Sequence, residues 1–391
     1  MPASITRDFL IVAGSYERLL YGLAGTFEGS ESSVSIPSLE PSFIYPAHIS
    51  CIKALSANQR FLASGSTDEH VKLYDLKLRK EVGTLMHHTG SITSLAFYKR
   101  SHLLTGSEDG TIGIVRTSDW ELLKTLTGHK YAVNSMHVHP SGKVLLSVGK
   151  EGTLKCWDLS RGICAYSMKL PKASDQVAWS PKGDYYAVLM DKEVHIHDVD
   201  SGKAVAQLKA PSRINAFAFT TLFGKDQAQV VVTGEESQKM TVWDLAGEQV
   251  AAWETNDGTR VKDMDSLVIE ETTFITTCST NGKIKCWDLK KMVQDASVPP
   301  VTQYDAKCRL TCVIMFPTLP PSSVTKKDEE DKVTAAYDSC LSEYEEERPK
   351  PVVSVTLEGE KATKKKPKGK KRKAKVQKAA EDAKLVKKDS E

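Results

Sequence analysis

Val242-Trp243-Asp244-Leu245 is one of six copies of a strand ending that recurs along this chain of 391 residues. The other copies are Leu73-Tyr74-Asp75-Leu76, Ile114-Val115-Arg116-Thr117, Cys156-Trp157-Asp158-Leu159, Ile196-His197-Asp198-Val199 and Cys286-Trp287-Asp288-Leu289. Successive copies are 41, 42, 40, 46 and 44 residues apart. A period near 40–45 residues that ends in an aromatic residue and aspartate is typical of a propeller blade of four short strands. The repeat therefore predicts an all-β propeller.

The repeat over residues 132–168 shows the four expected strands, a to d, most clearly. We predict strands over 132–138, 143–148, 153–158 and 163–168, because alternating apolar residues there are bounded by turn residues. No segment of residues 1–317 has convincing helical periodicity.

The two ends of the repeat region supply one further blade between them. Residues 9–14, 18–22 and 33–45 look like strands b, c and d, and residues 309–316 look like a strand a without followers. Three N-terminal strands and one C-terminal strand would then form a composite blade that closes the ring and removes two open sheet edges. We therefore predict a seven-bladed propeller, in which the composite blade is blade 1.

Charge is distributed unevenly along the chain, although the formal net charge is only +3. Residues 1–317 carry a net charge of −1, residues 318–360 of −6 and residues 361–391 of +10. We predict a seven-bladed propeller over 1–317, an acidic disordered linker over 318–360 and a basic, disordered C-terminal tail over 361–391.

Several classes of site are not expected. None of the eight cysteines belongs to a Cys-x-x-Cys pair, and two His-x-His pairs (His137/His139 and His195/His197) lack a third ligand nearby. We expect neither a metal nor a cofactor.

No secretory leader and no run of about 18 apolar residues occurs, so we expect a soluble intracellular protein without a membrane partner, monomeric outside its complexes.

Polar residues in three blades resemble the WD-repeat family, in which a buried histidine, hydroxyl, carboxylate and tryptophan form one hydrogen-bonded network. The predicted members are His48, Ser64 and Asp68 in blade 2, His88, Thr105 and Asp109 in blade 3, and His129, Ser147, Glu151 and Trp157 in blade 4. A Ser-His-Asp grouping is also found in hydrolases. Its threefold repetition favours a structural role, and we predict no enzymatic activity.

The residue before strand a divides the ring into two parts. This residue is Cys51, Ser91, Ala132 and Ala173 in blades 2 to 5, but Arg213, Arg260 and Arg309 in blades 6, 7 and 1. In a propeller this position faces one rim of the central channel. Because a guanidinium group suits carboxylate or phosphate recognition, we predict a partner-binding arc of Arg213, Arg260, Lys262 and Arg309. The alternative is a chance coincidence of exposed arginines.

The tail contains a dense basic run that predicts nuclear and nucleolar targeting. Its residues are Lys364, Lys365, Lys366, Lys368, Lys370, Lys371, Arg372 and Lys373. Sequence-independent RNA contact and a merely solvating tail are the alternatives. The run has no aromatic residue on which bases could stack, so we expect no reading of RNA sequence.

Six stretches occur together and in order: Ala13-Gly14-Ser15-Tyr16-Glu17, His87-His88-Thr89-Gly90-Ser91-Ile92, Phe97-Tyr98, His139-Pro140-Ser141-Gly142-Lys143, Arg260-Val261-Lys262-Asp263-Met264 and Arg309-Leu310-Thr311-Cys312. Together they resemble the p21-activated protein kinase-interacting protein family, with its yeast maintenance-of-killer counterpart, over residues 10–316. The resemblance implies a non-enzymatic scaffold in nucleolar assembly of the large ribosomal subunit, with assembly proteins or pre-rRNA of pre-60S particles as partners. The alternative that it implies is an adaptor that binds and inhibits a p21-activated protein kinase in signalling.

Overall fold

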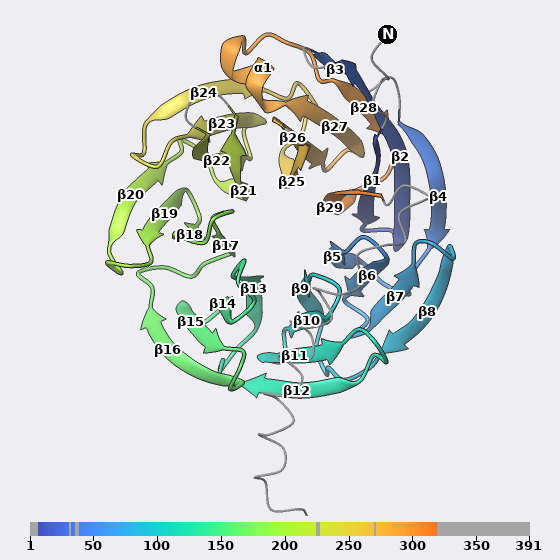
Figure 1. The fold of residues 1–391 in the computed structure, drawn as a ribbon, viewed down its shortest axis with the longest axis vertical. Helices are drawn as coiled ribbons and strands as arrows, with labels where there is room; N and C mark the ends of the chain where they lie inside the picture. The colour runs from blue at the N-terminus through green and yellow to red at the C-terminus, as the bar shows by residue number, and fades with distance from the viewer. Residues whose placement is uncertain (1–6, 31–32, 36–38, 224–226, 270, 319–391) are drawn as a thin grey trace, which may run out of the picture. The chain divides into compact units, whose positions relative to one another are not determined.

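The computed structural model describes residues 7–30, 33–35, 39–223, 227–269 and 271–318. These residues form seven antiparallel sheets that stand around a central opening (Figure 1). The prediction of an all-β, seven-bladed propeller is confirmed. Thr318 is the last described residue, so the rest of the predicted linker and the whole predicted tail lie outside the described residues.

Blades 2 to 4 each contain four strands in the order a, b, c, d. Blade 2 contains β5 (Ile52–Ala57), β6 (Phe61–Ser66), β7 (Val71–Asp75) and β8 (Lys80–Leu85). Blade 3 contains β9 (Ile92–Tyr98), β10 (His102–Ser107), β11 (Thr111–Arg116) and β12 (Leu122–Thr127). Blade 4 contains β13 (Val133–Val138), β14 (Val144–Gly149), β15 (Thr153–Asp158) and β16 (Ile163–Lys169), close to the strands predicted for this repeat.

Blades 5 to 7 follow the same order. Blade 5 contains β17 (Gln176–Trp179), β18 (Tyr185–Met190), β19 (Glu193–Asp198) and β20 (Ala204–Lys209). Blade 6 contains β21 (Ile214–Leu222), β22 (Ala228–Glu235), β23 (Lys239–Trp243) and β24 (Gln249–Glu254). Blade 7 contains β25 (Val261–Ile269), β26 (Thr272–Ser279), β27 (Lys283–Asp288) and β28 (Thr302–Asp305).

Blade 1 is composite, as predicted. The C-terminal strand β29 (Leu310–Pro317) pairs with β1 (Arg7–Ser15), which pairs with β2 (Leu19–Ser30), and β2 pairs with β4 (Glu40–Pro46). The predicted fourth strand over 33–45 is wrong in its first half. Residues Ser33–Ser35 form a separate short strand, β3, which pairs with the end of β2, so strand d begins only at Glu40.

The hydrophobic core lies between the blades rather than within them. A cluster of buried apolar side chains fills each of the seven seams between neighbouring blades. At the seam between blades 1 and 2, for example, Val12 and Leu20 pack with Ile52 and Leu62, all of them buried. Full burial of such a side chain stabilises the fold by about 1.5–3 kcal/mol, so each blade depends on its two neighbours.

The aspartate of the repeated strand ending caps the turn or helix that follows strand c. Asp75, Asp158, Asp198 and Asp244 each accept a hydrogen bond from a backbone N–H two or three residues further on. In blade 7, Asp288 instead caps the short helix α1 (Leu289–Gln294), which sequence periodicity did not predict because it is only six residues long. Within the described residues, no helix is long and apolar enough to cross a lipid bilayer.

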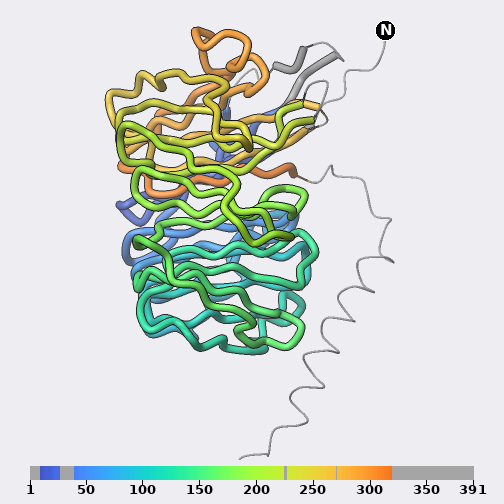
Figure 2. The backbone as a smooth tube through the Cα atoms, turned by 90° about the vertical axis from the view of Figure 1, so that its left-hand side faces the viewer, coloured from blue at the N-terminus to red at the C-terminus, as the bar shows by residue number. Residues whose placement is uncertain are grey.

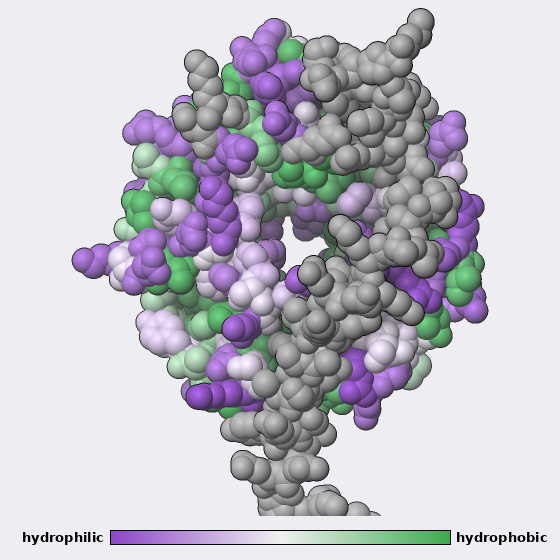
Figure 3. Space-filling view, viewed as in Figure 1, coloured by the Kyte–Doolittle hydropathy of each residue, from purple (hydrophilic) through white to green (hydrophobic). Residues whose placement is uncertain are grey.

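The innermost strands of the blades surround the central opening, which the space-filling view also shows (Figures 1 and 3). Seen from the side, the turns gather at the two faces of the ring (Figure 2). We define the rim face as the face that carries the b–c turns and the loops from strand d to the next strand a. The other face carries the a–b and c–d turns.

Candidate partner-binding surface at the channel rim

The predicted polar network of blade 4 is assembled in the structure. Nδ1 of His129 lies 2.6 Å from Oε1 of Glu151, and Nε2 lies 2.7 Å from the hydroxyl oxygen of Ser147. The Trp157 indole N–H donates to the same hydroxyl over 2.8 Å. Burial lowers the pKa of His129, although its contact with Glu151 raises it in part. The network therefore holds a neutral histidine.

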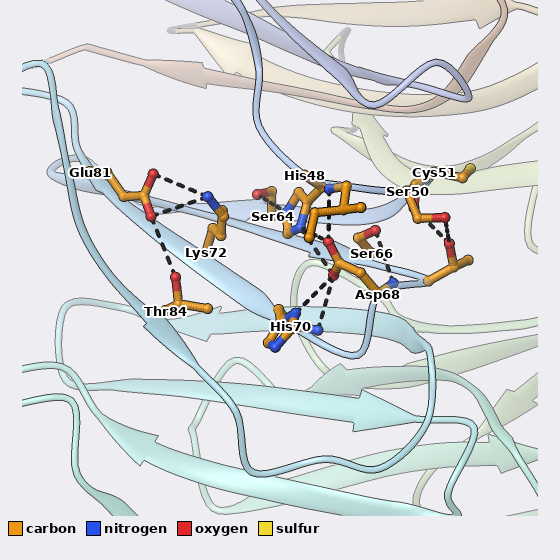
Figure 4. Close-up of polar contacts among 12 residues, drawn as sticks. His48, Ser50, Cys51, Ser64, Ser66, Asp68, His70, Lys72, Glu81 and Thr84 are labelled. Carbon is orange, nitrogen blue, oxygen red and sulfur yellow. Dashed lines mark hydrogen bonds and ion pairs between the residues drawn. The ribbon is translucent and has the colours of Figure 1, made fainter.

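Blade 2 repeats this arrangement without a tryptophan. His48 lies between Ser64 and Asp68, at 2.7 Å and 3.0 Å (Figure 4). Asp68 also accepts the backbone N–H groups of Ile49 and His70. Burial raises the pKa of Asp68, but the combined effect of His48 and these two N–H groups is larger and lowers it. The net shift of the pKa is therefore downward. The carboxylate thus fixes the loop before strand a to the b–c turn.

Blade 3 contains a network member that sequence reasoning missed. His88 lies 2.8 Å from the Thr105 hydroxyl and 2.9 Å from Asp109, as predicted, but Nε2 of His87 also lies 2.8 Å from that hydroxyl. Gly113 makes room for this ring, since a Cβ atom there would lie 2.6 Å from Nε2 of His87. Two signals were available: the doublet of adjacent histidines, and the valine that replaces tryptophan at position 115.

Blades 6 and 7 have buried networks of other residues, which the sequence pattern did not indicate. In blade 6, the fully buried Glu235 accepts hydrogen bonds from Ser212 and Thr241. In blade 7, Lys285 forms a buried ion pair with Asp257 at 2.7 Å. These carboxylates and this ammonium group provide the polar contacts that histidine provides in blades 2 to 4.

Blade 5 replaces the network with aromatic contacts, and these involve both His-x-His pairs. The ring centroids of His139 and Trp179 are 4.7 Å apart, and those of Tyr186 and His197 are 4.9 Å apart in a stacked arrangement. His137 accepts the backbone N–H of Trp179. Among the described residues, no group of three or more histidine, cysteine or acidic side chains is arranged to hold a metal. The two pairs therefore contribute to packing.

The residues before strand a occupy equivalent places on the rim face. The carbonyl of Arg213 accepts the N–H of Glu236, and that of Arg309 accepts the N–H of Tyr16. The corresponding carbonyls of Cys51, Ser91 and Ala132 accept hydrogen bonds in the same way. Arg213 and Arg309 are exposed, whereas Arg260 and Lys262 are half-buried. The rim therefore carries all four predicted cations, but they differ in their partners.

Arg213 and Arg260 are paired with acidic side chains. Arg213 donates to Asp175 over 2.8 Å and lies 3.9 Å from Asp191, so it links blades 5 and 6. Its hydrogen bond with Asp175 raises the pKa of the guanidinium. Arg260 lies 3.3 Å from Glu236. Both arginines thus have a structural use across a seam between blades.

Arg309 and Lys262 form no ion pair with a described carboxylate. The Arg309 guanidinium lies 5.0 Å from the centre of the Tyr16 ring, a cation–π contact. Nearby, burial raises the pKa of the Cys51 thiol, while the charges of Lys53, Lys262 and Arg309 oppose that shift. Three cations from blades 2, 7 and 1 therefore act on one point of the rim.

A β-bulge in strand a directs a further side chain towards the neighbouring blade. The register shifts around Thr93, Asn134, Asn215 and Thr311. Each of these side chains donates to a backbone carbonyl of the next blade: Val133, Ser174, Val261 and Ile52, respectively. Lys53 and Lys262 occupy the same bulge position in blades 2 and 7. Bulges of this kind re-aim side chains at sheet ends.

A groove with a volume of about 880 Å³ lies between blades 1 and 2. Its apolar wall includes Phe9, Phe43, Tyr45, Leu62 and Tyr74, and charged residues of both signs complete its lining: Glu40, Asp75, Arg79, Lys80 and Glu81. No sequence pattern indicated this groove, because its walls come from segments far apart in the chain. Its mixed charges favour no single class of ligand.

Comparisons with known proteins agree with this architecture. The family model described as "WD domain, G-beta repeat" matches residues 39–75, 79–114 and 120–158. The chain is 33% identical over 307 residues to "p21-activated protein kinase-interacting protein 1-like" of Danio rerio, covering 78% of this chain and 80% of the relative.

Two further relatives extend the comparison. The protein of the same name from Xenopus laevis is 32% identical over 352 residues, which covers 90% of this chain and 92% of the relative. "Protein MAK11" of Saccharomyces cerevisiae is 30% identical over 349 residues, covering 79% and 83%. Identity of this extent, together with the seven-bladed fold, shows that the chain belongs to the p21-activated protein kinase-interacting protein family of WD-repeat proteins.

Proposed function

We propose that this protein is a non-enzymatic scaffold in nucleolar assembly of the large ribosomal subunit, and that it docks assembly proteins or pre-rRNA on its rim face. The observation that carries the proposal is that Lys262 and Arg309 form no ion pair with a described carboxylate, and that Arg309 lies over the ring of the exposed Tyr16. The blades are also joined by apolar seams and carry buried polar networks, which suits a rigid platform.

The family resemblance supports the ribosomal role, since it implies a factor of pre-60S particles. The basic run over residues 364–373 supports a location in the nucleus and nucleolus, because counterion release favours an RNA-rich compartment for such a segment. This run lies outside the described residues, so its contribution rests on composition.

Co-sedimentation tests the scaffold proposal. On a sucrose gradient of nuclear extract, the tagged protein is expected to migrate with pre-large-subunit particles, and its depletion is expected to lower the yield of large subunits. Absence from these particles together with normal ribosome production would contradict the proposal.

The names of the relatives favour a second candidate function. Those from Danio rerio and Xenopus laevis are named as interacting with p21-activated protein kinase. We propose as the alternative that the chain is an adaptor that binds and inhibits such a kinase. A binding assay with a purified kinase regulatory fragment tests this, and binding should persist when residues 361–391 are removed.

A further inference from the structure

The rim cations that stand before strand a or at its bulge separate into two groups when their partners are compared. Lys53 pairs with Glu108 at 2.7 Å, Arg213 with Asp175 at 2.8 Å and Arg260 with Glu236 at 3.3 Å. Arg309 and Lys262 have no such partner among the described residues. Glu17 is close to Arg309, but it accepts the backbone N–H of that residue rather than a guanidinium N–H. Of these five cations, the two without an ion pair therefore lie on blades 7 and 1.

Exposed apolar side chains border this charge. The Tyr16 side chain lies under the Arg309 guanidinium and the residue is 57% exposed, and Ile49 in the next blade is 81% exposed. The two loops are joined, because the N–H of Ala47 donates to the carbonyl of Arg18 over 3.1 Å. A ligand at this place would meet cations and apolar surface together.

From this juxtaposition we propose that Lys262, Arg309, Tyr16 and Ile49 form the binding centre of the rim face. Its ligand is an acidic peptide segment of a partner protein. Carboxylates of the peptide contact Lys262 and Arg309, and an adjacent apolar side chain packs on Tyr16 or Ile49. This inference rests on the proposed docking function and names the chemistry of the partner.

The surrounding charges favour a peptide over a nucleic acid. A nucleic-acid backbone requires a track of several unneutralised cations, since its affinity comes from many phosphate contacts. At this rim, carboxylates stand among the cations, and Asp175, Asp191, Glu236 and Glu108 would repel phosphates on either side of the centre. A peptide with one or two carboxylates needs only Lys262 and Arg309.

The arginine is also held ready for a carboxylate. Stacking on Tyr16 restricts the guanidinium, and a planar guanidinium can donate two parallel hydrogen bonds to one carboxylate. Pre-organisation of this kind reduces the entropy that is lost on binding. Truncation of Tyr16 should therefore weaken binding even though it removes no charge.

Selection from a display library of random twelve-residue peptides tests the inference, with the full chain as bait. Peptides that also bind a Lys262→Glu/Arg309→Glu variant are removed by counter-selection, and this step subtracts peptides that bind the basic tail. The matched control is Arg161→Glu/Lys182→Glu, which reverses two exposed charges in turns of the opposite face. Thermal melting of each variant checks its fold.

Selected peptides are expected to be rich in aspartate and glutamate next to an aromatic or aliphatic residue. Their affinity should fall about tenfold or more in Lys262→Glu/Arg309→Glu and stay unchanged in the control. If the charge reversal does not fold, Lys262→Gln/Arg309→Gln and Tyr16→Ser/Ile49→Ser replace it, each with an expected loss of several fold.

Three outcomes would overturn the inference: no enrichment, selected peptides that are neutral or basic, or binding that survives these substitutions. A fourth is tight binding of a twelve-nucleotide uridine RNA that the charge reversal abolishes, because the ligand class would then be nucleic acid. The sucrose-gradient experiment measures association with pre-large-subunit particles independently of the peptide selection. Particle association with a failed selection would leave the scaffold role intact and reject only the acidic peptide.

Discussion

Nε2 of His87 lies 2.8 Å from the Thr105 hydroxyl. This contact in blade 3 corresponds to the one between the Trp157 indole and the Ser147 hydroxyl in blade 4. His88 donates to Asp109 through Nδ1, so its Nε2 accepts the hydrogen of the Thr105 hydroxyl, and His87 must donate to the hydroxyl oxygen. A loop histidine thus replaces a strand tryptophan as the donor of the network.

Removal of the shared hydroxyl should be costly. In Thr105→Val the shape of the side chain is kept, but the Nε2 atoms of His87 and His88 lose their polar partner, while His88 keeps its contact with Asp109. An unsatisfied buried polar group costs about 1–3 kcal/mol, so we expect a loss of about 2–4 kcal/mol in the free energy of unfolding. Urea unfolding measures this loss. Thr125→Val, on the exposed outer strand β12, is the matched control and should change stability little.

The network shows how far the sequence could predict this structure. The histidine, hydroxyl and carboxylate of blades 2 to 4 recur at fixed spacings, so alignment of the repeats was enough to find them. His87, Glu235 and the Lys285–Asp257 pair stand at positions that the repeat does not mark. Glu235 and the Lys285–Asp257 pair become visible only when the fold places them beside a buried hydroxyl or an opposite charge, whereas the histidine doublet and Val115 were signals for His87.

The pH dependence of stability should report the half-buried His87. Burial and the neighbouring His88 lower the pKa of His87, while Asp109 opposes the shift, and the net pKa is about 4. Between pH 6.5 and 4 the unfolded chain binds a proton that the folded protein does not, so stability falls as the pH falls through this window.

Substitution with glutamine isolates this effect. In His87→Gln an amide N–H can still donate to Thr105, but the titration is gone. We expect the stability of the variant to decline less steeply below pH 6.5, by up to about 1.4 kcal/mol per pH unit, in chemical unfolding at a series of pH values. Parallel curves for the two proteins would contradict the assignment.

The strand that closes the ring should show the opposite dependence. Asp263 and Asp265 accept the N–H groups of Val313 and Met315 in β29, over 3.0 Å and 2.8 Å. Burial raises the pKa of Asp263 to about 7 and that of Asp265 to about 6. The folded protein therefore keeps protons that the unfolded chain has released, and stability falls as the pH rises from about 4 to 7.

Asp263→Asn removes one of these titrations while it keeps an acceptor for Val313. The difference in unfolding free energy should shift in favour of the variant as the pH rises from 4 to 7. The slope should stay below about 1.4 kcal/mol per pH unit, because Asp263 retains some exposed surface. A difference that is independent of pH would show that Asp263 is already ionised at pH 4.

The rim shows where sequence reasoning reached its limit. The repeats placed arginine before strand a in three successive blades, and the structure puts those residues on one face. The acidic partners come from other turns and blades: Asp175 and Asp191 approach Arg213, and Glu236 approaches Arg260. Charge that is available to a ligand depends on such neighbours. Alignment of the repeats therefore could not show which of the four cations form ion pairs.

The ion pair between Arg213 and Asp175 should contribute little to stability. Both side chains are about half exposed, at 51% and 45%, and solvent screens such pairs. A double-mutant cycle with Arg213→Ala and Asp175→Ala is expected to give a coupling energy of about 0.2–1 kcal/mol in urea unfolding. The coupling should decrease as salt is raised.

The same variants separate a structural from a binding role for Arg213. If its charge is used by the pair, Arg213→Ala should leave the affinity of the selected acidic peptides within about twofold of the wild type, whereas Arg309→Ala should lower it about fivefold or more. Fluorescence anisotropy with a labelled selected peptide measures both values. An equal loss in the two variants would show that Asp175 releases Arg213 to the ligand, and the binding centre would then extend from blade 1 to blade 6.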